Sequence, residues 1–287
     1  MPANRTARVA LPSITLPPIL MRNKQIVWTI AAALSLGSIS HGQVIISDTF
    51  AGKDGTVLGS SHSPEVNMPG GSYILSTSND GSNSGVLPTL SNHQLVLDGS
   101  SSAALSLEAG VNVSKPRKMT VSAQLAVGTI AAESTDTFVR GLGVGFYSNP
   151  PTGSSDGLNG NFTGIVMDAY DGSLNLFYPA ADTSKSNKPT IAYNSAVLGP
   201  FSATTIYTLI YTVDTKTGAI SNVTLSDSKG VEKGTFAPAP DQGPDSMNVF
   251  TDAQTKYVAV MATTNGATPE LSQVASFKVT TASDSDN

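Results

Sequence analysis

The stretch YTLIYTVDTKTGAISNVTLSDSKG, residues 207–230, holds the pattern that decides the fold. Along its first half, apolar side chains alternate with mostly polar ones. The apolar positions are Tyr207, Leu209, Tyr211 and Val213. A period of two is typical of a strand with one buried face. Gly218 ends the segment DTKTG, where glycine can supply a positive φ, and Val223 and Leu225 then resume an apolar face. The stretch therefore predicts an antiparallel hairpin.

Similar short runs, separated by Gly, Asn, Asp, Ser and Pro, continue in both directions from this hairpin. The other predicted strands lie at 44–50, 71–77, 93–99, 102–110, 118–128, 137–148, 256–264 and 272–281, with a second hairpin at 162–178. No stretch favours a helix, and the spacing leaves no room for the crossover helices of a parallel sheet. We predict an all-β fold, an antiparallel two-sheet β-sandwich of jelly-roll type.

The N-terminal region has the pattern of an export signal. Arg22 and Lys24 precede an apolar run at 26–36, and the small residues Ser40 and Gly42 follow, as before a signal-peptidase cleavage. The run is too short for a helix that spans a membrane. An uncleaved N-terminal anchor is the alternative interpretation.

This pattern predicts three parts of the chain. Residues 1–42 are a leader and signal peptide, with Met21 as the true start; residues 43–281 are one sandwich domain; residues 282–287 are a disordered tail. We expect the processed protein to be secreted, periplasmic or held at the cell surface, with no membrane span in the mature chain.

Composition excludes several classes of function. Removing residues 1–42 leaves 12 basic and 21 acidic residues, a formal charge of −9, which disfavours nucleic acid and anionic membranes as partners. The chain has no cysteine, so disulfides, thiolate metal sites and cysteine catalysis are excluded.

Four segments carry a resemblance to a known family. They are IISDTF (45–50), DGSLNLF (171–177), YTLIYTVDTKTGAISNVTLS (207–226) and SFKVT (276–280). Together they resemble the concanavalin A-like lectin/glucanase superfamily, in particular bacterial laminin-G-like modules, over residues 44–281. The resemblance implies a jelly-roll fold whose members bind or cleave glycans or adhere to surfaces. Related domains often carry Asp-Asn before the last phenylalanine, where the aspartate helps to hold calcium; Ala275 and Ser276 stand there in this chain.

The hairpin FTGIVMDAYDGSLNLFY, residues 162–178, contains the best candidate for a sugar site. Asp168 and Tyr170 fall on the same face of its first strand, opposite Ile165 and Met167. A carboxylate beside an aromatic ring suits a sugar, since the acid binds hydroxyls and the ring supports the apolar face of the pyranose. Asp-Gly at 171–172 predicts a two-residue turn, so Asp171 is assigned to the turn. A solvated outer face is the alternative for Asp168.

A run of alternate glycines suggests a groove beside that hairpin. Gly141, Gly143 and Gly145 share one face of their strand, and Leu142, Val144 and Phe146 share the face expected to be in the core. The glycines would leave bare backbone as the floor of a ligand groove, unless loop 148–161 folds over them. The predicted ligand-binding residues are Asp168, Tyr170, Tyr147, Gly143 and Tyr178, with Tyr193 as a further aromatic candidate.

No catalytic residues are predicted. Laminarinase-type relatives place their catalytic acids in one strand as Glu-x-Asp-x-(x)-Glu, so that they share a face. The five glutamates here, Glu65, Glu108, Glu133, Glu232 and Glu270, are never within four residues of one another. Two histidines of the mature chain, His62 and His93, are assigned to surface loops.

Calcium is the cofactor that the loops favour. Carboxylate oxygens amid Gly, Ser and Asn suit this ion, although no EF-hand spacing is present. The candidate ligands are Asp54, Asp80, Asp156 and Asp182.

Three functions agree with this pattern. The first is an exported, non-catalytic module that binds polysaccharide, cell-surface glycan or another extracellular partner. The second is a polysaccharide-active enzyme, a glycoside hydrolase or lyase, with acids from separate strands. The third is a structural or adhesive surface protein. Trp28, the only tryptophan, lies in the leader, so any sugar platform must use tyrosine or phenylalanine.

Overall fold

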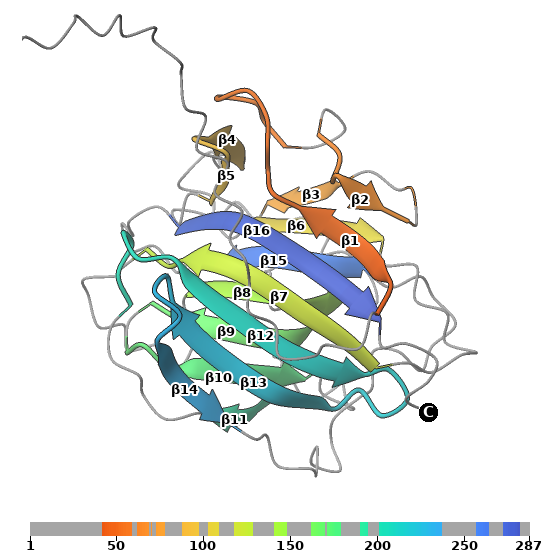
Figure 1. Cartoon of the computed structure of the whole chain (residues 1–287), viewed down its shortest axis with the longest axis vertical. Helices are drawn as coiled ribbons and strands as arrows, with labels where there is room; N and C mark the ends of the chain where they lie inside the picture. The colour runs from red at the N-terminus through yellow and green to blue at the C-terminus, as the bar shows by residue number, and fades with distance from the viewer. Residues whose placement is uncertain are drawn as a thin grey trace, which may run out of the picture. The chain divides into compact units, whose positions relative to one another are not determined.

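The computed structural model describes residues 42–58, 62–68, 70, 73–77, 88–97, 103–108, 118–128, 141–147, 162–169, 171–178, 190–194, 201–236, 257–263 and 272–281. They belong to one compact unit, Ile39–Asn287. In these residues the regular structure consists of strands β1 to β16, and all pairs are antiparallel (Figure 1). The predicted all-β, antiparallel two-sheet sandwich is confirmed.

Nine strands form the first sheet, sheet A. Their order is β14-β13-β12-β7-β16-β1-β2, and β5 also pairs with β16 and with β4. Their bounds are β1 (Val44–Asp48), β2 (Val66–Asn67), β4 (Thr89–Ser91), β5 (Gln94–Leu97), β7 (Lys118–Ala126), β12 (Tyr207–Asp214), β13 (Ile220–Asp227), β14 (Glu232–Phe236) and β16 (Ser272–Thr281).

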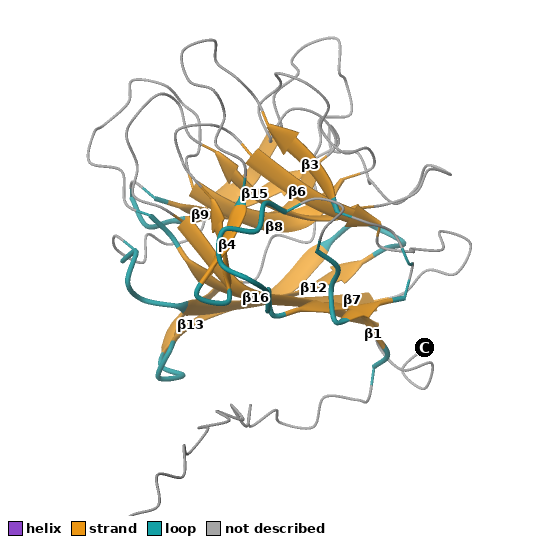
Figure 2. Ribbon diagram, turned by 90° about the horizontal axis from the view of Figure 1, so that it is seen from above, coloured by secondary structure: helices purple, strands orange, loops and turns teal. Residues whose placement is uncertain are grey.

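Seven strands form the second sheet, sheet B, in the order β11-β10-β9-β8-β15-β6-β3. Their bounds are β3 (Ile74–Thr77), β6 (Ala103–Glu108), β8 (Gly141–Tyr147), β9 (Phe162–Asp168), β10 (Leu174–Tyr178), β11 (Thr190–Asn194) and β15 (Tyr257–Thr263). Figure 2 shows the two sheets as two layers, with sheet A as the lower one.

The main core fills the space between the layers. Along β12 buried and part-exposed residues alternate without a break, as the period of two predicts. The predicted inward residues of sheet B, Leu142, Val144 and Phe146, join Leu209 and other sheet A residues in this core. The Tyr211 hydroxyl donates a hydrogen bond to the Val144 carbonyl at 2.9 Å, which joins the sheets directly.

The hairpin of β12 and β13 forms as predicted. Gly218 has a φ of 75° and its N–H donates to the Asp214 carbonyl at 2.7 Å. Asn222 has a φ of 53°, and the register shifts opposite it. This irregularity keeps both Ile220 and Val223 buried although they are three residues apart, because an extra residue changes the phase of the pleat.

Two sequence predictions differ from the structure. The connection after β9 is not a two-residue turn: the Asp168 N–H donates to the Ser173 carbonyl, so four residues lie between them, with Gly172 at a φ of 72°. Strands β2, β4, β11 and β14 were not predicted. They are short or occur at sheet ends, where backbone pairing to a neighbour defines the strand more than its own side-chain pattern does.

Candidate functional site

The outer face of sheet B, which points away from the main core, carries a second apolar cluster. All of its members are at most 2% exposed. They are Tyr147, Phe162, Val166, Phe177, Ala259 and Met261. The Tyr147 and Phe162 rings lie 5.1 Å apart, and the Tyr147 hydroxyl donates to the Met261 sulfur at 3.2 Å.

The glycines of β8 make room for this cluster. A Cβ on Gly145 would lie 2.6 Å from the Phe162 ring, and one on Gly143 would lie 3.1 Å from Met261 Cγ and Val166 Cγ2. All seven residues of β8 are buried. The prediction of a strip of bare backbone is therefore wrong, because side chains of β9 and β15 cover the glycines. Residues 148–161, the alternative cover, lie outside the described residues.

The structure places the predicted ligand-binding residues in different surroundings. Tyr147 and Gly143 are buried in the second apolar cluster. Asp168 is part-exposed at the end of β9. Tyr178 ends β10, where the backbone alone is described, and Tyr170 lies outside the described residues. Their role in binding stays a prediction.

Polar groups gather around Asp168 at one end of the outer face. Asp168 Oδ1 accepts a hydrogen bond from the Asp171 N–H at 3.4 Å, and Asp171 Oδ1 accepts one from the Ser173 N–H at 2.8 Å. The buried Asn175 amide donates to Ser173 Oγ at 2.9 Å. Ser173, Asn175 and Phe177 share this face by strand alternation. A carboxylate, an amide and a hydroxyl thus border an otherwise apolar surface.

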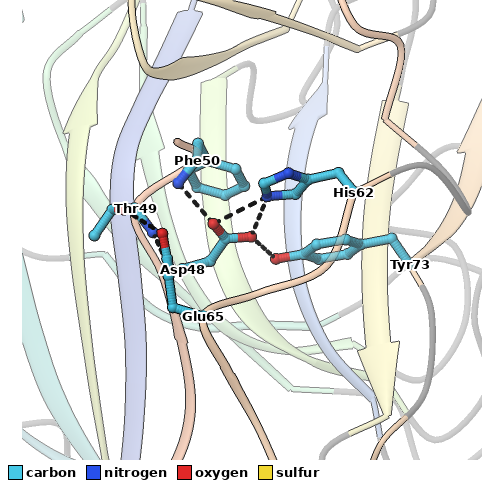
Figure 3. A network of polar contacts seen from close by, with 6 residues as sticks. All are labelled: Asp48, Thr49, Phe50, His62, Glu65 and Tyr73. Carbon is cyan, nitrogen blue, oxygen red and sulfur yellow. Dashed lines mark hydrogen bonds and ion pairs between the residues drawn. The ribbon is translucent and has the colours of Figure 1, made fainter. Parts of the chain in front are cut away.

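A second polar group is centred on Asp48 at the end of β1 (Figure 3). This carboxylate is fully buried. His62 Nε2 lies 3.1 Å from Oδ1 and 3.0 Å from Oδ2, the Tyr73 hydroxyl donates to Oδ2 at 2.5 Å, and the Phe50 N–H donates to Oδ1 at 2.6 Å. We call Asp48, His62 and Tyr73 the Asp48 cluster.

Aromatic rings enclose the Asp48 cluster. The His62 ring stacks between Phe50 and Tyr73, with centroids 6.1 Å from each, and Phe50 in turn packs on Phe277 at 6.0 Å. The side chain of His62 is 8% exposed, so its assignment to the surface is wrong. His93 is exposed as predicted, in the turn between β4 and β5. No sequence spacing could have paired His62 with Asp48, because the two lie 14 residues apart and His62 belongs to no strand.

The Asp48 cluster joins the two sheets rather than forming an open reaction site. Asp48 belongs to sheet A, whereas Tyr73 directly precedes β3 of sheet B. Next to it, the Thr49 N–H donates to Glu65 Oε2 at 2.9 Å, and the Thr49 hydroxyl donates to Oε1 of the same side chain. Buried polar groups that are fully satisfied in this way rigidify a fold.

Three buried tyrosines predict a loss of stability in alkali. Burial raises the pKa of Tyr73, Tyr147 and Tyr211, and the Asp48 charge adds to the effect at Tyr73. The pKa values of these tyrosines in the folded protein exceed the value near 10 of an unfolded chain. Their contribution to the free energy of unfolding is therefore fully present below pH 10 and is lost as the pH rises further. Each should reduce the free energy of unfolding by about 1.4 kcal/mol per pH unit above pH 10.

Urea denaturation at pH 8, 10 and 11, with tyrosinate absorbance followed in parallel, measures this effect. Three tyrosines should ionise only as the chain unfolds. Ionisation of every tyrosine near pH 10 in a folded protein would contradict the assignment.

The predicted calcium ligands are not brought together in the described residues. Asp54 Oδ1 accepts a hydrogen bond from the Asn92 N–H at 2.8 Å, while Asp80, Asp156 and Asp182 lie outside the described part. No group of three or more metal-ligating His, Asp or Glu occurs where the chain is described. Nor does this part contain a helix long and apolar enough to cross a membrane.

No protein-family model and no curated protein sequence matches this chain. Similar solved structures include lectin I-B4 from Griffonia simplicifolia in a metal-free form (12% identity, TM-score 0.45, 73% of this chain and 92% of that one). Another is lectin II from Ulex europaeus, with 14% identity and a TM-score of 0.47 over 73% of this chain and 92% of that one. A third is the carbohydrate recognition domain of Emp47p, with 14% identity and a TM-score of 0.43 over 73% of this chain and 89% of that one. At such identities and TM-scores these likenesses carry no conclusion about what this chain binds or does.

Proposed function

We propose that this chain is an exported, non-catalytic β-sandwich that binds carbohydrate at the Asp168 end of the outer face of sheet B. The observation that carries the proposal is the part-exposed Asp168, fixed by the Asp171 N–H beside the buried Asn175 amide and Ser173 hydroxyl. A part-exposed carboxylate accepts hydrogen bonds from sugar hydroxyls, and its contact with the Asp171 N–H restricts its side-chain freedom before binding.

The register of sheet B argues against Asp168 and Glu108 as a pair of catalytic acids. Asp168 of β9 pairs with Gly141 of β8, which pairs with Thr263 of β15. Glu108 of β6 pairs with Tyr257 of β15, six residues before Thr263. Glu108 therefore lies three strands across the sheet and about six residues along it from Asp168. Strand spacing and rise put these two backbone positions about 25 Å apart. Glycoside hydrolysis needs carboxyls roughly 5 to 10 Å apart, so this pair cannot perform it.

A structural or adhesive surface protein is the second candidate function. The complete burial of β8 favours it, because the centre of the outer face offers no groove among the described residues. Such a protein would need no sugar contact at Asp168.

A glycan-array experiment separates these candidates. The full chain, processed by a bacterial expression host, is compared with Asp168→Asn and with the control Asp214→Asn, whose carboxylate accepts the Lys216 N–H in the β12–β13 turn. We expect Asp168→Asn to weaken glycan binding at least tenfold and Asp214→Asn to leave it unchanged. Absence of binding by the wild type, with and without calcium, would favour the structural role. Mass spectrometry of the exported protein tests cleavage after Gly42.

A further inference from the structure

The peptide bond between Gly42 and Gln43, where the leader is expected to be cleaved, lies directly before the first strand of sheet A. Strand β1 begins at Val44, which pairs with Thr280 of β16. In Figure 1, β1 accordingly starts beside the end of β16. Gly42 is part-exposed and Gln43 is exposed, so the bond between them lies at the surface. A cut at this bond would leave every residue of β1 in the mature chain.

Gln43 is held to the sandwich by its carbonyl group. The Thr281 N–H donates a hydrogen bond to this oxygen at 2.9 Å, and the Thr281 hydroxyl donates to it at 3.5 Å. Within the described residues these are the hydrogen bonds that Gln43 makes, so its α-nitrogen and its side-chain amide have no partner there. The fold thus fixes the carbonyl end of the residue and leaves the other two groups available for reaction.

Those two groups can react with each other once Gln43 is the first residue of the chain. Attack of the α-nitrogen on the side-chain carbonyl carbon, Cδ, closes an unstrained five-membered ring. The new bond from the α-nitrogen to Cδ replaces the bond from Cδ to the amide nitrogen, which leaves as ammonia with the proton that the α-nitrogen gives up. The step needs no oxidant, cofactor or second substrate. Part of the α-amino groups is unprotonated near neutral pH, since their ordinary pKa is about 7.7–8.0.

We propose that Gln43 becomes pyroglutamate after cleavage, so that the mature chain begins with a blocked and uncharged residue. The modification rests on the proposed export and on a cut after Gly42. It is compatible with the fold, because ring closure uses the α-nitrogen and Cδ and leaves the carbonyl that accepts the Thr281 N–H unchanged. Loss of the terminal charge also denies aminopeptidases the free amine that they require. The modification would thereby protect the contact between Gln43 and Thr281, which aminopeptidase removal of Gln43 would destroy.

Intact-mass spectrometry and Edman degradation of the exported protein test the proposal. The full chain, expressed with its leader, is compared with Gln43→Asn, which keeps a carboxamide but could close only a strained four-membered ring. We expect a wild-type mass about 17 Da below that of residues 43–287, from the loss of ammonia. Edman degradation of the wild type should be blocked until pyroglutamate aminopeptidase exposes Val44, whereas Gln43→Asn should have the unmodified mass and be read from its first residue. Equal thermal midpoints establish that both proteins fold.

The outcomes that contradict the modification are distinct from those that contradict the processing. A wild-type chain cut after Gly42 that keeps a free α-amino group would overturn the modification alone. A first residue other than Gln43 would overturn the proposed cut, and the modification with it. A synthetic peptide of residues 43–50, carried through the same preparation, should stay unblocked; equal ring closure in this peptide would assign the reaction to sample handling and reject the proposal. Glycan binding at Asp168 is tested independently of all these results.

Discussion

Replacing Asp48 by alanine is expected to lower the free energy of unfolding by about 3–5 kcal/mol, the largest effect of any single polar change in the described residues. The carboxylate is fully buried and accepts hydrogen bonds from the Tyr73 hydroxyl and the Phe50 N–H, with His62 Nε2 at 3.0 Å. Its removal leaves these donors without an acceptor in a site that water barely reaches. Urea denaturation followed by tyrosine fluorescence measures the loss.

A matched control distinguishes the effect of breaking the Asp48 cluster from the effect of removing an aspartate in general. Asp214→Ala removes a carboxylate that accepts one hydrogen bond, from the Lys216 N–H at 2.8 Å, at a part-exposed turn. We expect it to cost about 1 kcal/mol or less. A double-mutant cycle with Tyr73→Phe should give a coupling energy of about 1–3 kcal/mol to Asp48. Equal losses for Asp48→Ala and Asp214→Ala would contradict the structural role of the cluster.

Gly141→Ala is expected to destabilise the protein by about 3 kcal/mol through overpacking. A Cβ at this position would collide with the Met167 carbonyl oxygen and lie 2.8 Å from the carbonyl carbon. These are backbone atoms of the neighbouring strand β9, so no side-chain rotation relieves the collision and the pairing of β8 with β9 must shift. The thermal midpoint and the urea midpoint should both fall.

Gly143→Ala is the control on the same face of the same strand. Its Cβ would meet the flexible Met261 side chain and Val166 Cγ2, each at 3.1 Å. Since methionine adapts its shape readily, we expect a change within about 1 kcal/mol. Similar losses at both positions would mean that strand propensity, and not the close approach of β9, determines the effect.

Both pairs of variants concern residues whose importance the sequence could not indicate. The alternation of Gly141, Gly143 and Gly145 was visible, and their shared face was confirmed, but it suggested an open groove. Phe162 and Met261, which fill that space, lie on strands whose register with β8 has no local sequence signal. Likewise, His62 met Asp48 only through the fold of the segment between β1 and β3.

The sequence by itself determined the fold class, the faces of the main strands and the hairpin at Gly218, because a period of two and turn residues are local properties of the chain. It also placed Asp171 in the connection after β9, although not with the length that this connection has. The tertiary structure decided that the outer face of sheet B is buried around β8, and it decided which groups donate hydrogen bonds to Asp48. Those features depend on contacts between segments far apart in the chain, whose energies are set by packing and strand register rather than by any residue's neighbours.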